Sequence, residues 1–168
     1  MAIPEPGCCD GPNELLRKIL IGLPEVGTST AVSPQYGYFY NLSILTPIPI
    51  EGDFPFDLDG QFTSGFTHAA NSPDIVIVNS GIYSVQFSAS TTESGQIQLF
   101  LGGIDVPGAC YGSGAGTQQN HGFVIISATA GQSLNIRNHS SAAALTPQSL
   151  SGGTQLNSVN SLLITKLA

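Results

Sequence analysis

Charged side chains are scarce in this sequence. Asp, Glu, Lys and Arg make up only 9% of its 168 residues, whereas they supply about 25% of an average soluble protein. The four basic residues are outnumbered by eleven acidic ones. A protein that binds nucleic acid or an anionic membrane surface needs a basic patch to neutralise phosphates. The composition therefore argues against both kinds of partner.

Long hydrophobic runs are absent as well. The longest, residues 15–23, is interrupted by Arg17, Lys18 and Gly22 and is far shorter than the roughly 20 residues that cross a bilayer. The first twelve residues have neither the basic region nor the apolar stretch of a secretion signal. We therefore expect synthesis in a cytoplasm without a signal peptide, and no membrane insertion.

Cysteine occurs three times, and an odd number leaves at least one thiol without an intrachain partner. Cys8 and Cys9 are adjacent, and a bridge between neighbours strains the peptide that joins them. Each of the two therefore pairs more easily with another chain. We expect Cys110 to lie in a Gly-rich turn. Two alternatives remain open, namely interchain disulfides through Cys8 and Cys9 or three free thiols.

Apolar residues, by contrast, are plentiful. At 41% of the chain they exclude a disordered protein and suit one domain with a sizeable core. The folded part offers trypsin only Arg137 and Lys166, both within predicted strands. We expect resistance to trypsin beyond the first twenty residues, and rapid digestion of the folded protein would contradict a compact β domain.

The N-terminal segment, residues 1–24, differs from the rest. After a Pro- and Gly-rich start, residues 12–22 predict a short helix with Pro12 at its first position and Gly22 as its stop. A helix this short is marginal alone, so its apolar stripe must pack against this domain, sister chains or another protein. The stripe consists of Leu15, Leu16, Ile19 and Leu20. We interpret the segment as an anchor for partner docking.

Residues 25–168 follow a period of two, which predicts β-strands. Short strands separated by turn residues, without helical stretches between them, indicate an all-β sandwich or jelly roll. A Ser-, Ala- and Gly-rich loop is expected over residues 140–157. The predicted strands are residues 35–45, 54–58, 61–68, 75–78, 82–90, 97–101, 123–128, 133–138 and 159–167. Residues 104–108 predict a short edge-like piece that ends in a turn at Pro107-Gly108.

The first predicted strand places Tyr36, Tyr38 and Tyr40 on one face, and Phe39 interrupts an otherwise small and polar opposite face. Three tyrosines are more aromatic surface than one sandwich face usually needs. Aromatic side chains are enriched at subunit interfaces, because their rings bury well while the hydroxyl finds a partner. The row is therefore a candidate oligomer interface, and the alternative is that the tyrosines line the core.

Catalytic and metal-binding patterns are weak. His68, His121 and His139 have no metal-ligand spacing, and no Ser lies in a Gly-x-Ser-x-Gly elbow. A Cys110–His121 nucleophile pair is disfavoured by its placement in turns. We expect no catalytic residue, no metal centre, no cofactor and no enzymatic activity.

One acidic stretch, residues 51–60, leaves an alternative open. Asp53, Asp57 and Asp59 could supply carboxylate oxygens to calcium, although their spacing does not match an EF-hand loop. Asn41 and Asn138 begin glycosylation sequons. A calcium site near these aspartates would favour a ligand-binding or adhesion module.

Four short motifs, taken together, resemble a known family. They are residues 79–85 (Asn-Ser-Gly-Ile-Tyr-Ser-Val), 101–108 (Leu-Gly-Gly-Ile-Asp-Val-Pro-Gly), 130–136 (Ala-Gly-Gln-Ser-Leu-Asn-Ile) and 161–167 (Ser-Leu-Leu-Ile-Thr-Lys-Leu). Their order and spacing are similar to the C-terminal domain of the collagen-like exosporium glycoproteins of Bacillus and Clostridium spores. This chain lacks the collagen repeat, as does a short exosporium basal-layer protein with the same kind of domain.

The resemblance implies a tumour-necrosis-factor-like jelly roll that forms a homotrimer on the spore surface, in the exosporium or on an appendage. It also implies synthesis in the mother-cell cytoplasm. We expect a structural protein attached to other spore-surface proteins through residues 1–24. The alternative is an adhesion or ligand-binding module that presents its loops.

Overall fold

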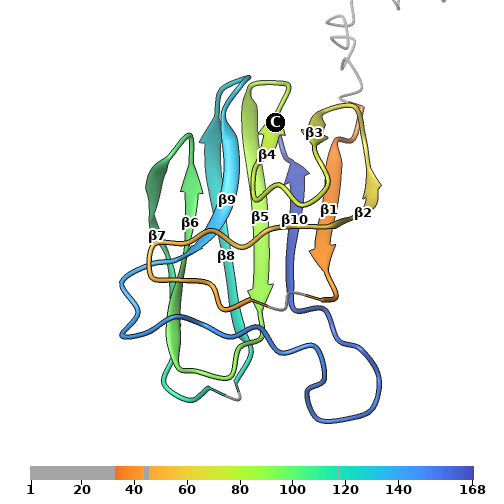
Figure 1. The fold of residues 1–168 in the computed structure, drawn as a ribbon. Coiled ribbons are helices and arrows are strands. Elements are labelled where there is room, and N and C mark those ends of the chain that lie inside the picture. The colour runs from red at the N-terminus through yellow and green to blue at the C-terminus, as the bar shows by residue number, and fades with distance from the viewer. Residues whose placement is uncertain (1–32, 44–45, 117) are drawn as a thin grey trace, which may run out of the picture. The chain divides into compact units, whose positions relative to one another are not determined.

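The computed structural model describes residues 33–43, 46–116 and 118–168, drawn in colour in Figure 1. Residues 34–168 form one compact unit. Among the described residues no helix has the length and hydropathy that a membrane span requires. The predicted N-terminal helix, Cys8, Cys9 and the predicted domain boundary after residue 24 lie outside the described residues.

Two five-stranded antiparallel sheets pack face to face, as the alternating pattern predicts (Figure 1). The first sheet, in the order β2-β1-β10-β5-β8, contains β1 (Tyr36–Asn41), β2 (Leu58–Phe62), β5 (Gly81–Ala89), β8 (Asn120–Ala128) and β10 (Asn160–Lys166). The second sheet, in the order β3-β4-β9-β6-β7, contains β3 (Phe66–His68), β4 (Ile75–Ile77), β6 (Gly95–Leu101), β7 (Ile104–Ser113) and β9 (Ser133–Asn138).

The core lies between the sheets and consists of alternate residues from their inner faces. Sequence neighbours of these residues point outward, which explains the period of two. The largest fully buried side chains are Tyr83, Phe39, Phe54, Phe56, Phe66, Phe87, Ile75, Ile77, Ile97, Leu99, Leu134 and Ile136. Burial raises the pKa of the Tyr83 phenol above its ordinary value.

The predicted strands over residues 54–58 and 61–68 are wrong in extent. Residues 54–57 are irregular and belong to a crossing segment, residues 46–57. Within it, Phe54 N–H donates to the carbonyl of Ile136 and Phe56 N–H to that of Ser72. The strand β2 begins only at Leu58 and continues through Gly60, where a break was expected. Both Phe54 and Phe56 are fully buried. The two-residue spacing of these side chains therefore reflects burial in the core and not membership of a β-strand.

The predicted turn at Pro107-Gly108 is also wrong, because β7 continues through it to Ser113. Proline has no N–H to give to a ladder and is tolerated on edge strands. Strand β7 is such an edge, with a register irregularity opposite Gln98 and Phe100. Cys110 therefore lies in a strand and not in a turn.

Buried asparagines fasten the crossing segment. Asn138 is fully buried, and its Nδ2 donates to the carbonyl oxygens of Ile48 at 3.0 Å, Pro49 at 3.1 Å and Ala143 at 3.2 Å. The side chain of Asn41 is buried too and donates to the Pro55 carbonyl. Both sequon asparagines are thus enclosed in the folded domain, where a glycan cannot be attached to them.

The register gives the domain two distinct ends. Tyr36, at the start of β1, is opposite Thr165, near the end of β10, so the chain enters and leaves the domain at the same end. We call this the entry end; it lies at the top of Figure 1. At the other end, the loop end, β5, β7 and β9 finish and β6, β8 and β10 begin.

Candidate functional site

The outer face of the first sheet carries the tyrosine row. Tyr36 is exposed and Tyr38 and Tyr40 are half-buried, whereas Phe39 between them is fully buried. The tyrosines therefore do not line the core; the small and polar face that Phe39 interrupts is the inner one. The sequence left open whether these tyrosines line the core or an oligomer interface. They lie on the outer face of the sheet, where a partner can reach them.

Three cross-strand rows extend this face from β1 to β8. Paired neighbours in a sheet lie side by side on one face. The rows are Tyr36, Thr165, Ser84 and Ile125; Tyr38, Leu163, Gln86 and Phe123; and Tyr40, Ser161, Ser88 and His121. None of these positions holds Asp, Glu, Lys or Arg. We call this surface the tyrosine face.

Two of the tyrosine rings are fixed by packing against each other and against β2. Tyr38 and Tyr40 stack with their centroids 5.3 Å apart and their planes 17° from parallel. Gly60 of β2 lies directly against Tyr38, since a Cβ there would be 2.8 Å from Tyr38 Cδ1. The two rings are thus packed against each other, and the Tyr38 ring also lies against β2.

The β8 edge of the face is strongly apolar. The side chains of Phe123 and Ile125 are 65% and 66% exposed, which is unusual for large hydrophobic residues next to one another on a face. The neighbouring edge of β7 adds Ile104, which is 71% exposed. Between the two edges lies an open hollow of about 390 Å³ lined by Ile104, Val106, Pro107 and Ile125, among others.

Close packing keeps the two edges together. The hydroxyl of Tyr111 on β7 donates to the carbonyl of Phe123 at 2.8 Å, and the Tyr111 ring packs edge-on against Phe87, with centroids 5.8 Å apart. Gly122 makes room for both rings, because a Cβ there would be 2.3 Å from Phe87 Cζ and 2.6 Å from Tyr111 Cδ2. The exposed residues Phe123 and Ile125 therefore belong to a strand that is tightly packed against β7.

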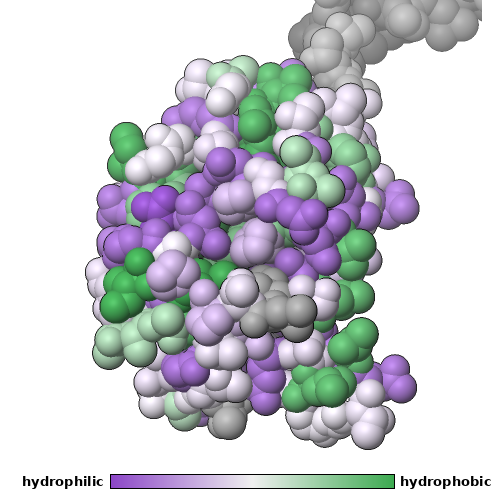
Figure 2. All heavy atoms as spheres, viewed as in Figure 1, coloured by the Kyte–Doolittle hydropathy of each residue, from purple (hydrophilic) through white to green (hydrophobic). Residues whose placement is uncertain are grey.

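The surface on the side of the domain that the crossing segment spans differs from the tyrosine face in its mixture of polar and apolar residues. Residues 46–57 run across the front of Figure 1. In the same view, Figure 2 shows hydrophobic residues in small separate groups among hydrophilic ones. This side has the mixed surface that is normal for water-facing protein.

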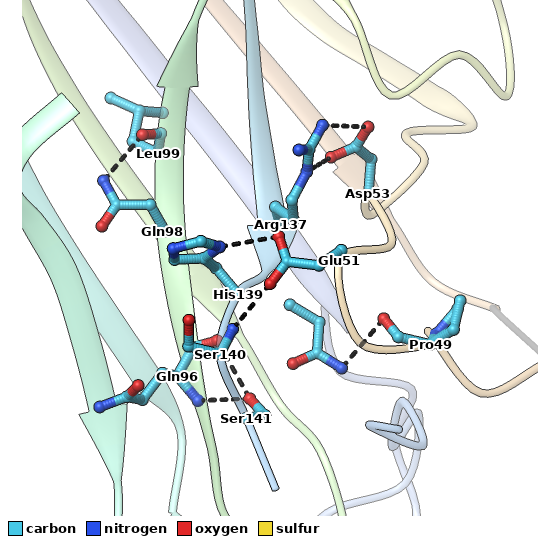
Figure 3. Close-up of polar contacts among 11 residues, drawn as sticks. Pro49, Glu51, Asp53, Gln96, Gln98, Leu99, Arg137, His139, Ser140 and Ser141 are labelled. Carbon is cyan, nitrogen blue, oxygen red and sulfur yellow. Dashed lines mark hydrogen bonds and ion pairs between the residues drawn. The ribbon is translucent and has the colours of Figure 1, made fainter. Parts of the chain in front are cut away.

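The acidic stretch lies on that side and serves the fold. Asp53 accepts two hydrogen bonds from Arg137 of β9, at 2.7 Å and 3.2 Å (Figure 3). The guanidinium also lies over the Phe100 ring, 4.2 Å from its centroid. The pairing with Asp53 raises the pKa of Arg137 above its ordinary value. The segment is thereby fixed alongside β9 of the second sheet.

Glu51 makes the adjoining contact. Its carboxylate lies 2.8 Å from Nδ1 of His139 and accepts the Ser140 N–H at 3.0 Å (Figure 3). The hydrogen bond with His139 and the one from Ser140 hold the pKa of Glu51 below its ordinary value. Glu51 has a φ of 62°, a strained conformation that these contacts help to hold.

The predicted calcium ligands are not brought together. Asp53 is paired with Arg137, while Asp59 lies 2.6 Å from Nδ1 of the buried His68. Within residues 33–43, 46–116 and 118–168, no group of three or more His, Cys, Asp and Glu side chains could hold a metal ion. The three histidines are also dispersed, since His139 pairs with Glu51 and His121 is exposed on β8.

Cys110 is a free thiol in the described part of the chain, at an exposed position of β7. Desolvation raises the pKa of its thiol above the ordinary value, and the thiolate is the reactive form. The site therefore disfavours nucleophilic chemistry. The predicted anchor residues Cys8, Cys9, Leu15, Leu16, Ile19 and Leu20 lie outside the described residues.

Phe123 and Ile125 were missed as candidates at the sequence level. Their signal is the run Phe-Val-Ile-Ile over residues 123–126, which is apolar on both faces of a strand. A strand with one face in water alternates hydrophobic and polar residues. The loss of alternation at β8 could therefore have indicated a second, outward-facing apolar surface.

Comparison with known proteins adds the fold class. No protein-family model and no curated protein matches the sequence. Among solved structures, the globular domain of zebrafish complement 1qA is similar over 79% of this chain and 95% of its own, at 7% identity and a TM-score of 0.55. Murine APRIL is similar over 80% of this chain and 100% of its own, at 12% identity and a TM-score of 0.51. The GITRL protein of bushbaby matches 81% of this chain and 96% of its own, at 12% identity and a TM-score of 0.50.

The domain therefore has the tumour-necrosis-factor-like jelly-roll fold that the sequence motifs implied. Identities this low establish the fold alone, because one fold serves many functions.

Proposed function

We propose that this chain is a structural protein of the spore surface, a homotrimer displayed in the exosporium or on an appendage. The observation that carries the assembly is the tyrosine face. It is wide, contains no charged residue, and ends in the exposed pair Phe123 and Ile125. Charge depletion with aromatic enrichment is the mark of an interface core.

The shape of this surface favours a closed ring over a face-to-face dimer. One part, Phe123 and Ile125, is exposed on an edge strand, and another is the aromatic area formed by Tyr38 and Tyr40. Two different complementary patches make a head-to-tail contact, which closes into a ring when the rotation permits. The family resemblance supports a ring of three.

The placement on a spore rests on the sequence motifs and on the segment 1–24. In this proposal the apolar residues Leu15, Leu16, Ile19 and Leu20 dock on another spore-surface protein. Cys8 and Cys9 form interchain disulfides once the surroundings become oxidising. The described domain then serves as the durable outer part.

No enzymatic activity is part of the proposal. Two of the three histidines are engaged in holding the fold, since His68 contacts both Asp59 and the Ser72 carbonyl, and His139 contacts Glu51. The low content of charged residues, 9% of the chain, suits a durable structural role.

Two measurements test the proposal. Light scattering on the full chain should give a mass about three times the 17.4 kDa of one chain, and a monomer at all accessible concentrations would refute the assembly. Non-reducing gels of spore extracts should show disulfide-linked species that vanish in a Cys8→Ser/Cys9→Ser variant. Unchanged attachment to spores in that variant would refute the anchoring role.

A ligand-binding module is the second candidate. Its calcium-dependent form has no support in the described residues, because Asp53 and Asp59 are held in separate pairs. A form without metal is favoured by a hollow at the loop end of the domain.

A further inference from the structure

The loop end contains a pocket of unusual composition. It has a volume of about 250 Å³, and all eight side chains that line it are those of Ser, Thr, Gln and Asn. They come from three separate segments, which follow β5, precede β8 and precede β10. We call it the amide pocket. The members that matter here are Ser90, Gln118, Gln119, Gln148, Ser151 and Asn157.

The walls of the amide pocket are fixed by hydrogen bonds. Asn157 Oδ1 accepts the Ser151 N–H at 2.9 Å, and its Nδ2 donates to the Gln148 carbonyl at 2.9 Å. The backbone of Ser90 is held on both sides, since its N–H donates to Val159 and its carbonyl accepts from Gln148. The pocket is thus preformed, as small-molecule sites usually are.

Other side chains of the pocket are left without partners. Among the described residues, the side chains of Ser90, Gln119, Gln148 and Ser151 make no hydrogen bond to the protein, and Gln148 and Ser151 bond only through their backbones. Each amide offers two N–H donors and one carbonyl acceptor, and each hydroxyl both donates and accepts. A ligand in the pocket would therefore meet donors and acceptors at several points, arranged on fixed walls.

The composition of the pocket selects the chemistry of its ligand. A charged ligand would lose its hydration without gaining an opposite charge, because no lining residue is ionisable. The nearest acid in the sequence, Glu93, accepts hydrogen bonds from Thr146 N–H and Oγ1. An apolar ligand would leave the polar lining unpaired at a cost. A neutral ligand rich in hydroxyl groups satisfies both conditions.

The size agrees with one sugar ring. The volume of about 250 Å³ is just below the roughly 300–1,000 Å³ of pockets for drug-sized ligands. A second hollow at the same end, of about 390 Å³, is lined by Gln96, Ser113, Ser140 and other uncharged residues. The loop end therefore has a second uncharged hollow besides the pocket.

We propose that the amide pocket binds a neutral saccharide, with one pyranose ring held by its hydroxyl groups against Gln119, Gln148 and Ser90. The inference goes beyond the structural role, since it assigns a ligand to the loop end. It does not depend on the number of subunits, because all lining residues belong to one chain.

The test is a titration of the ¹⁵N-labelled full chain followed by amide chemical shifts. The probes are glucose, galactose, mannose, rhamnose, N-acetylglucosamine and N-acetylgalactosamine, added singly. At least one should give saturable shifts centred on residues 90–91, 118–119 and 148–158. Glucuronic acid, the charged counterpart of glucose, should bind more weakly than the best neutral probe.

Two variants separate the pocket from nonspecific effects. Gln148→Leu removes the amide at similar volume and should weaken saccharide binding by at least about tenfold. Gln119→Leu should weaken it equally, and because Gln119 is exposed this second variant leaves the packing of the core unchanged. The matched control is Gln155→Leu, in the same loop but outside the pocket, which should leave binding unchanged.

Three outcomes would overturn the proposal: no saturable shift with any of the six probes, shifts that persist in both pocket variants, or equal binding of glucuronic acid. Each can occur while the chain remains a trimer. Failure here is therefore distinguishable from failure of the proposed assembly.

Discussion

Phe123→Glu is the sharpest perturbation of the proposed trimer. Full burial of a Phe side chain stabilises by about 1.5–3 kcal/mol, and 65% of this side chain is exposed in the single chain. Assembly can therefore gain about 1–2 kcal/mol per copy at this position, or about 3–6 kcal/mol per trimer. The substitution removes this gain.

The introduced carboxylate adds a second cost. An unpaired charge that becomes buried costs several kcal/mol, and the three rows of the tyrosine face contain no Lys or Arg to pair with it. Together the two effects exceed about 10 kcal/mol per trimer, which corresponds to about seven decades in the association constant. The isolated domain should lose no more than about 1 kcal/mol, since the site is exposed.

The assay is light scattering over a dilution series, with circular dichroism to verify the fold. The unmodified chain should remain trimeric where Phe123→Glu is monomeric. Leu156→Glu is the matched control, because Leu156 is 59% exposed but lies in the loop before β10, away from the tyrosine face. The reasoning is refuted if Phe123→Glu stays trimeric at the same dilution as the unmodified chain, or if Leu156→Glu dissociates equally.

Three further predictions concern stability, each measured by urea unfolding. Asn138→Leu should cost about 2–4 kcal/mol, because three carbonyl oxygens lose their buried donor; a loss below about 0.5 kcal/mol would contradict the fastening role. Gly122→Ala should cost about 1–3 kcal/mol through the clash with Phe87, whereas Gly114→Ala, which meets nothing within 4 Å, should be tolerated. Because the folded pKa of Glu51 is lowered, its contacts stabilise the fold above the ordinary Glu pKa of about 4.3 and are lost as pH falls through the lowered value; the stability difference between Glu51→Gln and the unmodified chain should therefore shrink below that pH, and a constant difference would contradict the contact.

Most strands were predictable because one face is buried and the other faces water. The sequence pattern places strands at 82–90, 133–138 and 159–167, close to the observed β5, β9 and β10. Each is bounded by Gly, Asn or Ser residues that end a ladder. Arg137 and Lys166 do lie in strands, β9 and β10, and the expected resistance to trypsin remains a prediction.

The crossing segment could not be predicted from periodicity. Phe54 and Phe56 alternate with Pro55 as they would in a strand, yet their N–H groups bond to two unrelated partners, Ile136 and Ser72. Only the packing of the sandwich determines that this segment lies against β9. A local hydrophobic pattern predicts which residues are buried. It does not predict which backbone segment will hydrogen-bond to them.

The candidate site was only half visible in the sequence. Alternation identifies two faces of β1 but does not say which one is inside, and the inner face holds only Phe39 between Gly37 and Asn41. The tyrosine face exists because register aligns Tyr38 with Leu163, Gln86 and Phe123. Cross-strand register is a long-range property that a single strand does not encode.

The separation of the two ends of the domain has a use in protein engineering. Pro34 and Ala168 both belong to the entry end, so a C-terminal tag would lie beside the place where the upstream chain arrives. The loop of residues 151–156 lies at the opposite end, and a Cβ added to Gly152 or Gly153 would meet no atom within 4 Å. Exposed glycine-rich loops tolerate insertions well. In the proposed attachment through residues 1–24, a peptide inserted between these glycines would lie at the end of the domain away from the entry end, which makes this loop the preferred position for presenting an antigen.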